Sequence, residues 1–384
     1  MMGRSKARLV AIASMFLLAP QAVAAASPFI EHTIVGPRLP IGGGDITRVG
    51  SATVLVTDVE QPADLEFCTF LPGSTPRLVL RRSTDRGATW TAGDVLSSPG
   101  ASSVGLSALA SAGARADLVW IEDGTLRYRR SSDAGLTWTA PSTLLSTVSS
   151  VRQIELLHAG SQVVVSRLVA STNRIALRIS SDNGASFGPV VRGPQVAAGG
   201  LHAMSLAGTT LFLAYRDSTG RLRVRASLDG GATFPRNRPV AYVRSSGAFG
   251  LASSPSVAIV AYVARSDFTR LLIRRSLDHG LSWLPAHVVI DLPGTLENLA
   301  QVSISRDPRT GKWTIFAQTE AGSTLYETES VDGGVHWSAR QRVMVDDDPS
   351  ALYGGISSGG IPIVLIDHPR SLGCETYVET WRRP

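Results

Sequence analysis

The sequence predicts an all-β fold, a propeller of four-stranded antiparallel blades, and three observations lead to it. Six copies of one short pattern recur at a period of about 50 residues, which is the mark of a stacked or radial repeat. Each repeat holds four short apolar runs separated by Gly, Ser, Thr and Pro. The two ends of the chain supply strands for one further sheet that would close the ring.

The recurring pattern is an eight-residue box that reads Ser-x-Asp-x-Gly-x-x-Trp, with Phe in place of Trp in two copies. An Asp side chain can accept hydrogen bonds from nearby backbone amides and close a turn, and Gly supplies a positive φ. The aromatic residue can anchor the next strand by burial between sheets. We therefore predict hairpin tips with structural aspartates at Asp85, Asp133, Asp182, Asp229, Asp278 and Asp332.

Alternating, arginine-rich strands precede the boxes. They include residues 78–82, 126–129, 222–225 and 271–274. Period-two alternation of this kind is typical of a strand with one wetter face. In the second repeat we expect strands at roughly 104–111, 116–121, 125–131 and 138–145, and four strands in such a unit make a propeller blade.

The number of blades follows from what the boxes leave over. Residues from about 38 to 345 make six units. Three strands without a box follow at 351–357, 361–366 and 376–381, and one strand precedes the first unit at 30–35. Three strands plus one make a closing blade that removes exposed sheet edges. We predict seven blades, with six as the alternative, in a single domain at 27–384.

The first 26 residues have the features of a secretory signal peptide. Three basic side chains at positions 4–8 precede an apolar run at 9–19, which is too short to span a membrane comfortably. Small residues that end at Ala24 or Ala26 form a candidate cleavage site. The sequence therefore predicts a mature chain that is secreted or periplasmic, with no membrane span.

Charge and cysteine usage narrow the function classes. The chain has 37 basic and 31 acidic residues, and its only lysines are Lys6 and Lys312. The arginines recur from blade to blade rather than gathering in one patch, so we predict no nucleic-acid role. Cys68 and Cys374 lie near opposite ends, and in an oxidising compartment a disulfide is predicted, with two unpaired buried thiols as the alternative. The histidines show no metal-ligand spacing, so neither a metal nor a cofactor is predicted.

A ligand site, if present, belongs on the face opposite the boxes, around the central channel. The polar residues that we place there are Arg38, Asp45, Asp58 to Asp64, Glu122, Asp123, His202, Arg216, Asp217, Arg265, Asp267, Asp346 to Asp348 and Tyr353. The three consecutive aspartates could bind a hard cation, but an acidic loop is usually only solvated.

These motifs resemble those of the sialidase superfamily, whose Asp-box (BNR) repeats read Ser-x-Asp-x-Gly-x-Thr-Trp. The segment that begins at Arg38 resembles the family's Arg-Ile-Pro motif, whose Arg is one of three that bind the substrate carboxylate. Residues 214–218 resemble the segment with the second such Arg, here Arg216, and the segment at Tyr353 resembles the one with the catalytic Tyr. The resemblance places the acid/base Asp at about Asp64, with Asp58 as the alternative.

Two components of the chemistry that this resemblance implies are missing, the base for the Tyr nucleophile and the third Arg. A Tyr nucleophile needs a neighbouring base, and the family has a Glu on the innermost strand of the blade with the second Arg. Residues 197–204 hold no acidic residue, so His202 is the substitute, or else a structural residue. The family's third Arg is missing from residues 326–329, and Arg274 is the remaining candidate.

The sequence therefore predicts an exported, non-catalytic or degenerate member that binds a glycan or an envelope or extracellular protein. The alternative is an active exo-sialidase-type glycosidase that uses Arg38, Arg216 and Tyr353. A third class is an assembly factor that docks protein partners.

Overall fold

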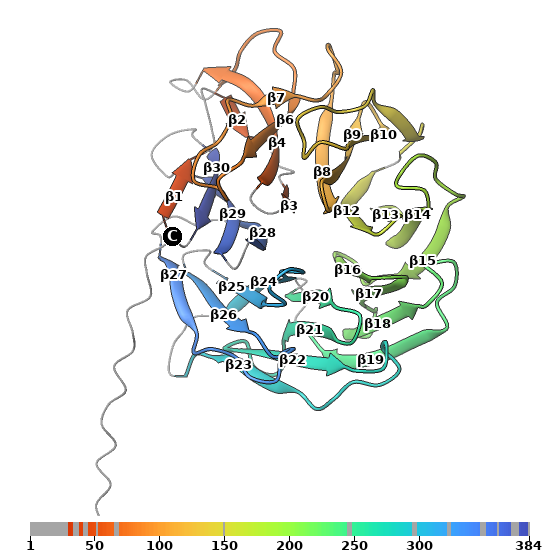
Figure 1. The fold of residues 1–384 in the computed structure, drawn as a ribbon, viewed down its shortest axis with the longest axis vertical. Helices are drawn as coiled ribbons and strands as arrows, with labels where there is room; N and C mark the ends of the chain where they lie inside the picture. The colour runs from red at the N-terminus through yellow and green to blue at the C-terminus, as the bar shows by residue number, and fades with distance from the viewer. Residues whose placement is uncertain are drawn as a thin grey trace, which may run out of the picture.

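A computed structural model of the protein describes residues 30–33, 38–40, 45–50, 53–64, 69–148, 150–243, 248–293, 298–320, 324–345, 351–358, 361–369 and 376–382. Within these ranges every regular element is a β-strand, and the strands form seven sheets around a central axis (Figure 1). The predicted all-β propeller with four-stranded antiparallel blades is confirmed. No helix in the described ranges is long and apolar enough to cross a membrane.

We number the sheets as blades in chain order. Blade 1 holds β2 (Arg38–Pro40), β3 (Asp45–Val49), β4 (Thr53–Asp64), β5 (Thr69–Phe70), β6 (Arg77–Ser83) and β7 (Asp94–Val95). Blade 2 holds β8 (Val104–Ala112), β9 (Arg115–Glu122), β10 (Thr125–Ser131) and β11 (Ser142–Leu145). Blade 3 holds β12 (Val151–Ala159), β13 (Gln162–Val169), β14 (Arg174–Ser180) and β15 (Val191–Gln195). Blade 4 holds β16 (His202–Ala207), β17 (Thr210–Arg216), β18 (Arg221–Ser227) and β19 (Arg236–Tyr242).

The remaining sheets complete the ring. Blade 5 holds β20 (Phe249–Ser253), β21 (Ala258–Val263), β22 (Arg270–Ser276) and β23 (His287–Asp291). Blade 6 holds β24 (Leu299–Arg306), β25 (Trp313–Thr319), β26 (Thr324–Ser330) and β27 (Gln341–Val345). Blade 7 holds β28 (Ala351–Ser358), β29 (Ile361–Pro369), β30 (Thr376–Arg382) and β1 (Ile30–Thr33).

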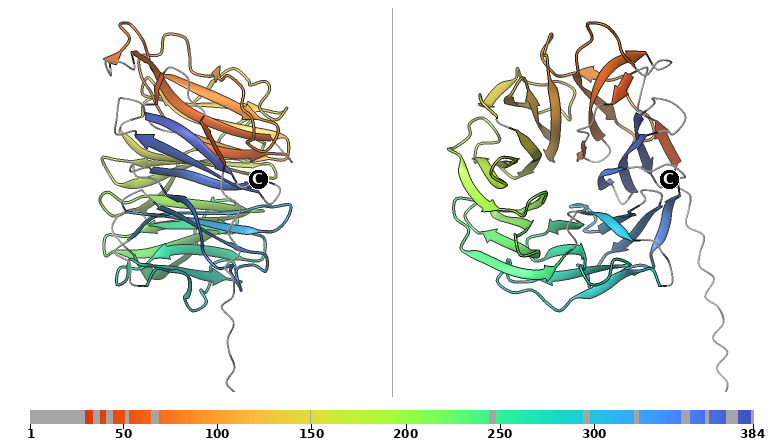
Figure 2. Two further views of the ribbon diagram at one scale, coloured as in Figure 1. Left: turned by 90° about the vertical axis from the view of Figure 1, so that its left-hand side faces the viewer. Right: turned by 180° about the vertical axis from the view of Figure 1, so that it is seen from behind.

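The innermost strands contact one another in a closed circle, in the order β3, β8, β12, β16, β20, β24, β28 and back to β3. The view from behind in Figure 2 shows the same ring. In blades 2 to 6 the four strands follow in sequence order, each antiparallel to the one before. These inner strands have a partner strand on one side only, so their other edge faces the channel.

The first and last strands of the chain close the ring. β1 pairs with β30 in blade 7, with Ile30 opposite Arg382. The predicted sharing of one sheet by the two ends is therefore confirmed. Blade 1 departs from the simple plan because the long strand β4 pairs with both β3 and β2, with Asp45 opposite Thr57 and Arg38 opposite Pro62.

The hydrophobic core lies between blades rather than at one centre. Trp120 of blade 2 is fully buried in a cluster with residues of blade 1, including Leu55. Trp313 of blade 6 is buried in the corresponding cluster with blade 5. The box aromatics Trp138, Phe187, Phe234, Trp283 and Trp337 pack against five such clusters. The aromatic residue in these five boxes thus ties its turn to an interface between blades.

Hydrogen bonds within each box close its turn. In the second box the Ser131 hydroxyl donates to Asp133 Oδ1 at 2.7 Å and accepts from the Gly135 N–H at 2.8 Å. Thr137 donates its N–H to Asp133 Oδ1 and its hydroxyl to Oδ2. The Thr137 and Ser131 hydrogen bonds lower the pKa of Asp133 to about 2. Equivalent bonds surround the aspartates of the other five boxes.

Arginines near the boxes fasten neighbouring blades together. Arg82 Nε donates to the Ala134 carbonyl in the next box at 2.9 Å, and Arg130 Nη1 donates to the Asn183 carbonyl at 3.0 Å. Because guanidinium groups present several donors on a long side chain, they can reach carbonyl groups across a blade interface. This arrangement explains arginines that recur from blade to blade without forming one basic patch.

Several predicted features lie outside the described residues. They are the signal peptide at 1–26, the disulfide partners Cys68 and Cys374, and the acidic run from Asp346 to Asp348.

Candidate functional site

Two carboxylates of inner strands bind backbone N–H groups of the neighbouring blade. Asp45 Oδ2 accepts the Leu109 N–H of β8 at 2.7 Å, and its Oδ1 accepts the Ile46 N–H at 2.7 Å. Glu155 Oε2 of β12 accepts the Met204 N–H of β16 at 2.8 Å. An inner strand leaves edge N–H groups without a partner strand, so these side chains satisfy them and link blades 1 to 2 and 3 to 4.

The same two carboxyl groups have separated pKa values. Burial raises the pKa of Asp45 to about 6, although the Leu109 and Ile46 N–H groups oppose the shift. Burial raises the pKa of Glu155 to about 8, and the negative charge of Asp45 adds to that shift while the Met204 N–H opposes it. At neutral pH the channel therefore holds a largely ionised Asp45 and a largely protonated Glu155.

His202 lies at the start of β16 and is buried, with 3% of its surface exposed. Its backbone N–H and carbonyl pair with the Gln153 side chain at 3.0 and 2.8 Å. Its Nε2 lies 2.6 Å from the Ser166 hydroxyl, and burial lowers its pKa to about 3. His202 is therefore a neutral imidazole that lies within the interface between blades 3 and 4.

Arg216 and Asp217 lie at the end of β17, where the sequence places a channel-face pair. Asp217 Oδ2 accepts a hydrogen bond from Arg223 Nε at 2.6 Å, and Oδ1 accepts from Thr219 and from the Arg221 N–H. This carboxylate holds its own turn. Arg216 is partly buried, and its Nε has no hydrogen-bond partner among the described residues.

For three further predicted site residues the structure describes the backbone only. Arg38 lies in β2, Asp64 ends β4, and Tyr353 lies in β28. The pairing of β28 with β29 shifts between Leu352 and Gly354, so Tyr353 occupies a β-bulge. Bulges are common beside active sites because they re-aim a side chain. Here the inner strands β8, β12 and β24 carry shifts in their own pairings, so the bulge is a repeated feature of the fold.

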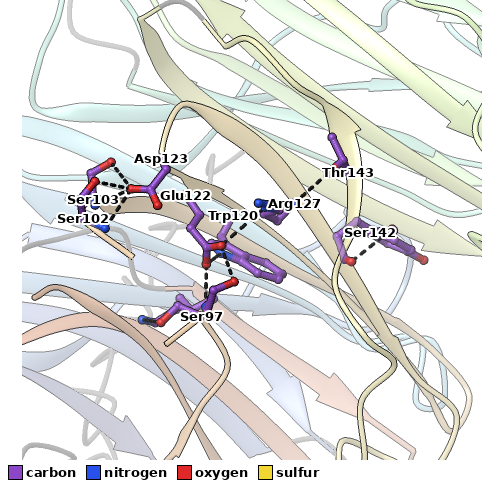
Figure 3. Close-up of polar contacts among 12 residues, drawn as sticks. Ser97, Ser102, Ser103, Trp120, Glu122, Asp123, Arg127, Ser142 and Thr143 are labelled. Carbon is purple, nitrogen blue, oxygen red and sulfur yellow. Dashed lines mark hydrogen bonds and ion pairs between the residues drawn. The ribbon is translucent and has the colours of Figure 1, made fainter. Parts of the chain in front are cut away.

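Glu122 and Asp123 end β9 on the predicted site face, and Figure 3 shows their contacts. Glu122 is 1% exposed; it accepts hydrogen bonds from the Ser98 N–H and hydroxyl at 2.8 and 2.6 Å and from Trp120 Nε1 at 3.0 Å. Burial alone would raise the pKa of Glu122, but these bonds outweigh it and lower the pKa. Asp123 accepts from Ser102 and Ser103. Both carboxylates therefore fasten the connection between β7 and β8.

Arg274, the candidate third carboxylate-binding arginine, lies in β22, the third strand of blade 5. Its side chain lines a groove between blade 5 and the outer strand β19 of blade 4. Its role beside Arg38 stays a prediction. No group of three or more His, Cys, Asp or Glu side chains that could hold a metal ion occurs among the described residues.

Comparison with known proteins extends the description of the fold. No family model and no curated protein matches the sequence. The structure is similar to the K499G mutant of NanB sialidase from Streptococcus pneumoniae, with 11% identity, a TM-score of 0.50, and coverage of 84% of this chain and 68% of that one. The chain has a sialidase-like β-propeller fold. This sialidase-like propeller is also similar to a protein of unknown function from Dyadobacter fermentans, with 12% identity, a TM-score of 0.52, and coverage of 92% and 97%.

Glu155 and Gln153 are the channel residues that sequence reasoning missed. A signal was present, because the alternation in β12 buries Ile154 and Leu156 and sets Gln153, Glu155 and Leu157 on the other side. The family resemblance predicts the base on the innermost strand of blade 4. The carboxyl group beside that strand instead comes from blade 3, whose contribution depends on how the blades stack.

Proposed function

We propose that this protein is an exported, non-catalytic sialidase-like propeller that binds a glycan or an extracellular protein on its channel face. The absence of a suitable base for a tyrosine nucleophile among the described residues supports this proposal. A Tyr hydroxyl has a pKa near 10 and needs a neighbouring group that accepts its proton.

Three described groups could act as that base, and none is suited to it. Asp45 is largely ionised, but both of its oxygens already accept backbone N–H groups, from Ile46 and Leu109. His202 is buried, lies against Ser166, and has a pKa lowered to about 3, so it is a very weak base. Glu155 has a pKa raised to about 8, so it is mostly protonated at neutral pH. Both Glu155 oxygens also accept hydrogen bonds, from Met204 and from Gln153. These contacts support a role for all three groups in joining blades.

One observation favours the alternative, an exo-sialidase-type glycosidase. A carboxyl group with a raised pKa can donate a proton to a leaving group, and Glu155 has such a pKa in the channel. In that alternative Arg38 and Arg216 would bind the substrate carboxylate, Tyr353 would be the nucleophile, and Asp64, or Glu155 in its place, would be the acid/base.

A turnover assay separates the two functions. The purified mature protein is incubated with a fluorogenic sialoside between pH 4 and pH 8, beside Tyr353→Phe and Arg38→Ala variants. We expect no turnover above the buffer rate in any of them. Turnover by the unaltered protein that both variants lose would refute the non-catalytic proposal and establish the alternative.

A further inference from the structure

A groove lies between blades 4 and 5, away from the inner strands of the ring. It has a volume of about 850 Å3 and is lined on one side by Pro239 to Tyr242 of β19. The other side consists of Tyr262, the segment from Ala264 to Ser266, and Arg274. Small-ligand sites in proteins have volumes of about 300–1,000 Å3, so this groove can hold one or two sugar rings.

The corresponding place between blades 2 and 3 is closed. There a cavity of only about 10 Å3 remains, because Arg178 extends across the interface and donates to the Leu144 carbonyl of the neighbouring outer strand. Arg274 holds the same position in its strand as Arg178, two residues before the box serine. No such contact across the interface is found for Arg274 among the described residues; its guanidinium lies near Tyr262 of its own blade, where its charge opposes the rise that burial causes in the Tyr262 pKa, and the groove stays open.

The groove is positively charged. Arg221, Arg265 and Arg274 line it, and none of its described lining residues is acidic. The nearby carboxylates are paired with other arginines. Asp217 lies 2.6 Å from Arg223, and Arg270 lies 3.5 and 3.2 Å from the two acidic residues Asp267 and Asp291. Three guanidinium groups without a carboxylate favour an anionic ligand.

Two features of the lining suit a sugar. Tyr242 is 49% exposed, and its ring is held by Arg221, whose guanidinium lies 5.0 Å from the ring centroid and whose Nε donates to the Tyr242 hydroxyl at 2.7 Å. A fixed aromatic face can pack against the apolar C–H face of a sugar ring. Arg274 and Arg265 also line the groove, and their guanidinium groups carry several N–H donors for polar groups of the sugar.

We infer that this groove binds an anionic sugar residue, with Arg274 and Arg265 on the acidic group and Tyr242 under the ring. The acidic group is a carboxylate or a sulfate, because the guanidinium fork binds both. No inner strand lines this groove, so the inference does not depend on the proposed function of the channel face.

Isothermal titration calorimetry of the full mature chain tests the inference. The probes are 3′-sialyllactose, trigalacturonic acid, lactose 3′-sulfate and neutral lactose, at low and at high salt. We expect at least one anionic probe to bind and lactose not to bind, with affinity that falls as salt rises. The carboxylate and sulfate probes distinguish the two acidic groups.

Variants locate the site. Arg274→Gln and Tyr242→Ala should each weaken binding about tenfold or more, since each removes one element of recognition. Arg225→Gln is the matched control, because Arg225 holds the same strand position in blade 4, and it should not change the affinity. Arg216→Gln is compared with the groove variants, because the proposed function places a ligand on the channel face to which Arg216 belongs. If Arg274→Gln does not fold, the exposed Arg265→Gln takes its place.

Four outcomes would overturn the inference. The first two are no binding by any anionic probe and equal binding of lactose. The third is loss of binding in Arg216→Gln but not in the groove variants. The fourth, with an acidic peptide as a further probe, is tighter binding of the peptide that Tyr242→Ala leaves unchanged.

Discussion

Replacing Glu155 with Gln should change how the stability of the protein depends on pH. The pKa of Glu155 is raised in the folded chain from 4.5 to about 8. Between these values the folded protein holds a proton that the unfolded chain has released, so the free energy of unfolding falls as pH rises. The steepest contribution is about 1.4 kcal/mol per pH unit, or about 5 kcal/mol over the whole interval. Glu155 is only half-buried, and screening by solvent reduces this to an expected 1–2 kcal/mol, order of magnitude.

Urea unfolding at pH 5, 6, 7 and 8 measures the effect. The unaltered protein should lose about 1–2 kcal/mol more stability over this range than Glu155→Gln. The two proteins should also differ in stability by an amount that does not depend on pH, because the Gln amide cannot accept from both Met204 and Gln153 as the carboxyl oxygens do. Only the part of the difference that changes with pH tests the pKa of Glu155. His158 and His202, whose pKa values are also shifted, are present in both proteins, so their contributions cancel. The charge of Asp45 raises the pKa of Glu155, so this coupling is part of the measured difference.

Glu122→Gln is the control. Its carboxyl has a lowered pKa, so its contribution changes with pH only below its usual value of 4.5. This variant should be less stable than the unaltered protein by an amount that stays constant from pH 5 to pH 8. A difference between the unaltered protein and Glu155→Gln that is equally constant would refute the raised pKa of Glu155.

Two further predictions concern the turns and the blade interfaces. Gly135→Ala should destabilise the fold by about 2–4 kcal/mol in urea unfolding, because Gly135 has a φ of +81° and an added Cβ would lie 2.8 Å from a Leu55 methyl group. Gly113 also has a positive φ but has open space around it, so Gly113→Ala should lower the free energy of unfolding by only about 1 kcal/mol. Equal destabilisation by the two variants would contradict this account. His158 Nδ1 lies 2.5 Å from buried Asp117, and hydrogen bonding to this carboxylate outweighs burial and raises the pKa of His158. The stabilisation by this pair should be complete below pH 6.5 and lost as pH rises through the raised pKa of His158. NMR titration of the imidazole measures this pKa, and a value below 6.5 would contradict the prediction.

The local parts of the fold could be predicted because their causes lie within a few residues. The Asp133 carboxylate bonds Ser131 and Thr137, two residues before it and four after it, and the box glycine has the positive φ that its position indicated. A sequence pattern can report such contacts directly. The shared sheet of β1 and β30 followed from counting strands, because a ring of sheets must close.

The candidate sites were less predictable because their contacts join distant parts of the chain. Glu122 ends β9, as the strand pattern predicts, yet its bond to Ser98 spans 24 residues and makes it a loop anchor. His202 was proposed as a substrate residue, and its contact with Ser166 comes from the neighbouring blade.

From the sequence alone one could determine the repeat, the four strands of each blade and the closing of the ring, since these depend on short-range hydrogen bonding and on burying every sheet edge. Only the tertiary structure decided which side chains make contacts between neighbouring blades and which line an open groove instead. Glu155 reaches Met204 in the next blade, while Arg274 lines an open groove beside Tyr242. The packing of one sheet against the next selects between such alternatives. It cannot be predicted from the strand sequences, because strands with the same alternating, arginine-containing pattern make different contacts.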